Sequence, residues 1–78
     1  MKQTVIARAA NEQGAGIEAK YANIEGEDAV RLVEETGEGS IREGIAKAFK
    51  EMFAEDPEQV AIVTLPYIAQ TDEETIEA

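Results

Sequence analysis

An apolar stripe along one predicted helix dictates much of the architecture. Ser40 and Glu43 match the S-x-x-E capping box, in which the serine oxygen accepts from the Glu43 amide and the Glu43 side chain returns to the Ser40 amide. Asp56-Pro57 is expected to close this helix, because proline cannot continue the hydrogen-bond ladder. The apolar residues of this helix fall at spacings of three and four, so they form one stripe along it, and an apolar stripe has to be covered by another apolar surface. The stripe consists of Ile41, Ile45, Ala48, Phe49, Met52 and Phe53.

Three segments have the patterns of β-strands and supply that surface. Residues 2–10 alternate in polarity and are followed by a stretch rich in asparagine and glycine. Residues 17–22 alternate between apolar and mostly charged side chains, so the first two segments predict an antiparallel hairpin. Residues 60–65 are apolar on both sides, which predicts two-sided burial or a partner. Pro66 lacks an amide donor and should end this strand or leave it at an edge.

The order strand, strand, helix, helix, strand predicts an α+β fold with a three-stranded, mainly antiparallel sheet. The helices are expected on one face of the sheet, the first of them over residues 27–36. We expect the third strand to lie beside the first, giving the order 2-1-3. Residues 1–69 should form a single small domain, and residues 70–78 an acidic, disordered tail.

The face of the sheet that the helices leave uncovered is expected to be apolar. It would contain Ile6 and one of two rows of the third strand, since successive strand residues point to opposite faces. These rows are Val60 with Ile62, and Ala61 with Val63 and Leu65. Exposed apolar patches usually mark an interface. We therefore name Ile6, Ile62 and Val63 as candidates for self-association in a homodimer.

The acidic residues are unevenly distributed along the 78-residue chain, which has 17 acidic and 7 basic side chains and a net charge of −10. Residues 1–24 have three bases and two acids, whereas residues 25–58 have four bases and eleven acids. Residues 59–78 add four acids and no base. The negative electrostatic field of such a chain repels nucleic acid and membrane surfaces and attracts basic proteins. It therefore predicts a basic protein partner and no direct contact with nucleic acid or membrane.

The first predicted helix has the densest group of acids. Glu34 and Glu38 are four residues apart, and like charges at that spacing repel. Carboxylates accept bidentate contacts from arginine as phosphates do, so a binding role would offset this cost. The alternative is that the acids serve only solubility. The residues assigned to this acidic partner-binding face are Glu25, Glu27, Asp28, Glu34, Glu35 and Glu38.

The composition argues against catalysis. The chain has no histidine and no cysteine, so general acid–base work near neutral pH and thiol chemistry lack their usual residues. Gly14 and Gly16 lack the third glycine and the following helix of a phosphate-binding loop, so a hairpin turn is the better interpretation. No cofactor or metal site is expected. No stretch approaches the roughly 18 apolar residues of a membrane span, which favours a cytoplasmic location.

The chain resembles small phage-encoded inhibitors of the anti-CRISPR type. The resemblance covers the whole chain in composition and layout: a short, acidic, cysteine-free α+β domain with Glu27, Glu34, Glu35 and Glu38 on one helix. It implies binding to the basic nucleic-acid channel of a bacterial defence complex and exclusion of DNA from it. We therefore expect a noncatalytic acidic module that inhibits its partner by occupancy. A structural homodimer, or an accessory subunit that uses the apolar face of the last strand, is the alternative.

Overall fold

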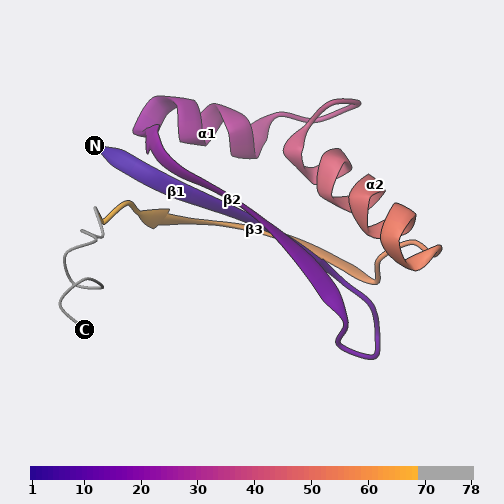
Figure 1. Cartoon of the computed structure of the whole chain (residues 1–78). Helices are drawn as coiled ribbons and strands as arrows, with labels where there is room; N and C mark the ends of the chain where they lie inside the picture. Colours follow the sequence, from indigo (N-terminus) through magenta and orange to yellow (C-terminus); the bar gives the residue numbers. More distant parts are fainter. Residues whose placement is uncertain (69–78) are drawn as a thin grey trace, which may run out of the picture.

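A computed structural model describes residues 1–68 (Figure 1). The three strands form one antiparallel sheet in the order β2-β1-β3, and both helices lie on the same face of it. The predicted α+β fold and the predicted strand order are confirmed, whereas the tail at residues 70–78 lies outside the described residues. In chain order the elements are β1 (Lys2–Ala10), β2 (Gly16–Glu25), α1 (Gly26–Glu34), α2 (Ile41–Phe53) and β3 (Gln59–Pro66).

Turn residues build the hairpin between β1 and β2. The Oδ1 atom of Asn11 accepts hydrogen bonds from the amides of Gln13 and Ala15, each at 3.0 Å. Gly14 has a φ of 91°, in the left-handed region that glycine enters without steric cost. A Cβ atom on Gly16 would lie 2.5 Å from a backbone carbonyl oxygen of β1, so this position requires glycine. The two glycines therefore serve the turn, as the sequence predicted.

A β-bulge lets β2 run further than its alternation of charge indicated. The pairing of β1 with β2 shifts register between Gln3 and Val5, and Asn23 has a φ of 62°. An extra residue in one strand disrupts the ladder locally and increases its twist. Beyond this bulge β2 continues to Glu25 rather than ending near residue 22.

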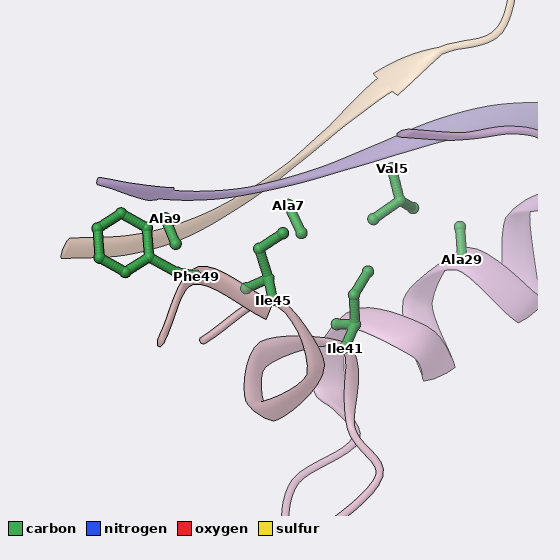
Figure 2. Packing of buried hydrophobic residues seen from close by; sticks show 7 residues of the cluster. All are labelled: Val5, Ala7, Ala9, Ala29, Ile41, Ile45 and Phe49. Carbon is green, nitrogen blue, oxygen red and sulfur yellow. The ribbon is translucent and has the colours of Figure 1, made fainter. Parts of the chain in front are cut away.

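The hydrophobic core fills the space between the sheet and the helices. Figure 2 shows Val5, Ala7 and Ala9 of β1 pointing toward α1 and α2, with the ring of Phe49 below the end of the strand. The small alanines of β1 leave room for the larger α2 side chains. Phe53 extends the cluster by stacking on Phe49, with ring centroids 4.4 Å apart. The buried apolar residues are Val5, Ala7, Ala9, Ala29, Ile41, Ile45 and Phe49.

The covered stripe of α2 is narrower than predicted. Ala48 is exposed and the Met52 side chain is 68% exposed, because the sheet contacts only the Ile41, Ile45 and Phe49 side of the helix. The helix also ends at Phe53 and not at the proline. Ala54 adopts a left-handed φ of 61° and its amide donates to the Lys50 carbonyl at 2.8 Å, which terminates the helix earlier.

The N-terminus of α2 has half of the predicted capping box. The Ser40 Oγ accepts a hydrogen bond from the Glu43 amide at 3.2 Å, as expected. The Ser40 amide, however, donates to the Gly37 carbonyl at 3.0 Å. The predicted return of the Glu43 side chain to that amide is therefore wrong, because a backbone acceptor already satisfies it.

β3 is covered on one side only. Val60 and Ile62 pack against the core, whereas Val63 and Leu65 are 43% and 48% exposed on the opposite face. Within residues 1–68 no helix or strand covers that face. The prediction of two-sided burial is thus not met within the described part of the chain, and the alternative of a partner stays open.

Candidate functional site

The solvent side of α1 forms an acidic surface. Ala29 is buried and Leu32 and Val33 pack against the core, so the opposite side of this short helix faces water. A shallow open hollow lies on that side, and we call it the α1 acidic hollow. Its lining residues are Glu27, Val30, Arg31, Glu34 and Glu35.

Three of the six predicted carboxylates meet in this hollow. Glu27, Glu34 and Glu35 are all exposed, and among residues 1–68 none of them has an ion-pair partner. Val30 lies in the same hollow with 54% of its surface exposed. The hollow therefore combines three carboxylates that are in no ion pair within residues 1–68, beside an Arg31 that is paired with Asp28, with an apolar contact surface.

Two other predicted residues are paired within the chain. The Nζ atom of Lys2 lies 2.8 Å from an Oε atom of Glu25, at the point where β2 meets α1. The hydrogen bond from Lys2, together with its positive charge, lowers the pKa of the Glu25 carboxyl below its usual value. The Asp28 carboxylate pairs with the Arg31 guanidinium on the next turn of the helix. Glu25 and Asp28 therefore have less charge to offer an external partner.

Glu38 lies apart from the α1 acidic hollow. The helix ends at Glu34, and Glu35 is already extended with φ −63° and ψ 138°. Glu34 and Glu38 are thus not on successive turns, and the predicted repulsion between them within one helix is wrong. Glu38 instead lines a second hollow of mixed charge beside α2. The charged residues of that hollow are Glu38, Glu43, Lys47, Lys50 and Asp56.

Two of the three residues proposed for self-association lie on the open face of the sheet. Ile6 of β1 is the cross-strand partner of Val63 in β3. Ile62 points to the helices and packs against the core, because successive strand residues alternate between faces. The expectation that its side chain could belong to the open apolar face is therefore wrong. Leu65 belongs to the same exposed row as Val63, and the alternation along β3 is the signal that identifies it.

No protein-family model, curated protein or solved structure matches the chain. Among the described residues no group of three or more acidic side chains is arranged to hold a metal ion. None of the helices within residues 1–68 has the length and apolar character needed to cross a membrane.

Proposed function

We propose that the protein is a noncatalytic binding module whose α1 acidic hollow docks on a basic surface of a partner protein. The observation that supports this role is the meeting of Glu27, Glu34 and Glu35 around exposed Val30, with none of the three in an ion pair within the described part of the chain because Arg31 is paired with Asp28. Arginine side chains of a partner would find bidentate acceptors there, and the valine would supply an apolar contact. The net charge of −10 would accelerate encounter with such a surface.

The partner that this chemistry fits is a protein whose basic surface otherwise binds nucleic acid. A surface lined by arginine and lysine for phosphate contacts accepts carboxylates by the same hydrogen-bond geometry. Occupation of that surface would exclude the nucleic acid and so inhibit the partner. The resemblance to anti-CRISPR inhibitors makes a bacterial defence complex in the cytoplasm the first target to assay.

A structural homodimer or accessory subunit is the second candidate, and the apolar row formed by half-buried Ile6 with exposed Val63 and Leu65 favours it. In that case the acidic residues serve solubility alone. The two candidates differ in which substitutions matter: changes in the α1 acidic hollow abolish the first function, and changes in the apolar row abolish the second.

A matched pair of triple variants tests the proposed function. Immobilised wild type and both variants are exposed to the same nuclease-treated bacterial lysate at about 50 mM salt, and bound proteins are eluted with salt and identified. We expect the wild type and the control triple to retain the same basic nucleic-acid-binding proteins, and the hollow triple to lose them. Equal recovery on both triples would refute the assignment. The hollow triple is Glu27→Gln, Glu34→Gln and Glu35→Gln, and the control triple is Glu12→Gln, Glu51→Gln and Glu58→Gln.

The control is matched in charge as well as in chemistry. Each triple removes three of the 17 acids, so both variants have a net charge of −7 in place of −10. The control residues are exposed and take part in no ion pair among the described residues. A difference between the triples therefore reports the position of the charge and not its total.

A further inference from the structure

The two edges of the sheet differ in how well they are protected from pairing with another strand. The β2 edge contains Glu18 and Lys20 and carries the bulge near Asn23, and charges and bulges both discourage edge-to-edge association. β3 forms the other edge and has no charged residue from Gln59 to Pro66. The β3 edge is therefore the one suited to accept a further strand.

The hydrogen bonds to β1 define which backbone groups of β3 point outward. The Tyr67 amide donates to the Lys2 carbonyl at 3.0 Å, and the same register holds along the whole of β3. Backbone groups of successive strand residues point to opposite sides, so the odd-numbered residues of β3 bond to β1. The backbone groups that point away from the sheet belong to the even-numbered residues, Val60, Ile62, Thr64 and Pro66.

At each end of this outward edge one backbone group is not available for pairing. The Nη1 atom of Arg42, on α2, donates to the Val60 carbonyl oxygen at 3.4 Å. Pro66, at the other end, has no N–H to donate. Between them, Ile62 and Thr64 have outward N–H and C=O groups with no hydrogen-bond partner within residues 1–68. The edge therefore lacks a free acceptor at one end and a donor at the other.

We propose that β3 pairs antiparallel with β3 of a second copy of the chain, about a twofold axis at Val63. Ile62 then lies opposite Thr64 of the other copy, and the two residues exchange both of their hydrogen bonds. Val60 lies opposite Pro66 of the other copy, and its N–H donates to the proline carbonyl. A regular pair would also have a hydrogen bond from the N–H of residue 66 to the Val60 carbonyl oxygen. Proline has no N–H to donate, and Arg42 already donates to that oxygen.

In this register Pro66, which lacks a donor, lies opposite Val60, whose acceptor is already occupied by Arg42. This complementarity favours a second copy of the chain over a foreign strand. A twofold contact requires a self-complementary surface, in which each residue of one copy meets its counterpart in the other. The side chains agree with this register, because Val63 meets Val63 and Ala61 meets Leu65 on the open face. No charged residue of β3 enters the interface, so the excess acid of each copy stays away from the axis. The inference is independent of the α1 acidic hollow.

Single cysteine variants test the register, since the chain has no cysteine of its own. Val63→Cys would place two thiols in a non-hydrogen-bonded pair with Cα atoms about 4.5 Å apart, within the range of a disulfide. We expect disulfide-linked dimers of this variant under mild oxidation. Leu65→Cys alone should stay uncrosslinked, whereas its mixture with Ala61→Cys should crosslink. Failure of Val63→Cys to crosslink, or equally rapid crosslinking of Leu65→Cys alone, would overturn the register.

The mass in solution tests the pairing itself. By sedimentation equilibrium at about 0.5 M salt, which screens the acidic charge, we expect twice the 8.5 kDa of one chain. Thr64→Pro removes an outward N–H without affecting the bonds to β1, and should raise the dimer dissociation constant at least about tenfold. Ile6→Thr is the matched control, because it would disrupt face-to-face stacking of two sheets but leave the β3 edge intact. A monomeric wild type, or a dimer broken by Ile6→Thr and not by Thr64→Pro, would contradict the proposal.

Discussion

The Oγ atom of Ser40 accepts a hydrogen bond from the backbone N–H of Glu43 at 3.2 Å, and this contact caps the helix that contributes Ile41, Ile45 and Phe49 to the core. Ser40 is only 2% exposed, so water cannot easily replace its hydroxyl. We expect Ser40→Ala to lower the free energy of unfolding by about 1 kcal/mol, measured by urea denaturation. Glu43→Ala should have less than about half that effect, because the Glu43 side chain does not reach the Ser40 amide. Equal losses in the two variants would indicate a complete capping box.

The covered side of α2 contributes far more to stability than its exposed side. Phe49 is fully buried, and Phe49→Ala should lower the free energy of unfolding by about 3–5 kcal/mol. Met52 lies three residues further along, with 68% of its surface exposed, so Met52→Ala should stay within about 0.5 kcal/mol of wild type. Thermal unfolding followed by circular dichroism separates the two variants. A large loss for Met52→Ala would mean that a second molecule covers this side chain.

The left-handed backbone at the end of α2 offers a stabilising substitution. Ala54 has a φ of 61°, a conformation that an L-residue with a Cβ atom adopts at a cost. Ala54→Gly should therefore raise the free energy of unfolding by about 0.5–1 kcal/mol. The matched change Ala48→Gly, on the exposed side within the helix, should lower it by about 1 kcal/mol. The opposite signs of the two changes in urea denaturation are the test, and a loss in both would contradict the left-handed assignment.

The ion pair between Lys2 and Glu25 should make stability depend on pH in the acidic range. In the folded protein the hydrogen bond from Lys2 and the charge of Lys2 lower the pKa of the Glu25 carboxyl from the usual 4.5. The ion pair therefore contributes to the stability of the folded state above that pH. The contribution is lost as the pH falls through the lowered value, when the carboxylate is protonated. Carbon NMR of the Glu25 carboxyl should report this titration, and Lys2→Gln should return it toward the usual pKa. An unchanged titration in Lys2→Gln would exclude the pair.

Local sequence patterns predicted the architecture because periodicity and caps act within one element. The spacing from Ile41 to Phe53 defined a helix with one apolar side, and the alternation around Val5 defined a central strand. The fold class, the strand order and the position of the Ser40 cap followed from such patterns.

The features that the sequence did not predict depend on contacts between elements. Ile62 and Val63 alternate in any register, and only the pairing of Val63 with Ile6 determines which of them faces the helices. Glu38 was grouped with the acidic helix on its i, i+4 spacing from Glu34, although the chain leaves the helix after Glu34 and is extended at Glu35. Met52 was placed in the core because periodicity does not reveal how wide a strip the sheet covers. In each case a boundary or a register, and not the residue type, decided the position.

The most direct test of the proposed function is the salt dependence of binding to a basic protein recovered from the lysate. Association rate and affinity would be measured at about 50 mM and about 500 mM salt, with and without competing DNA. We predict that salt slows association and weakens binding, that DNA competes, and that the triple variant of Glu27, Glu34 and Glu35 binds far more weakly than the charge-matched control. An affinity that is independent of salt, or equal in the two triple variants, would contradict the proposed role of the α1 acidic hollow.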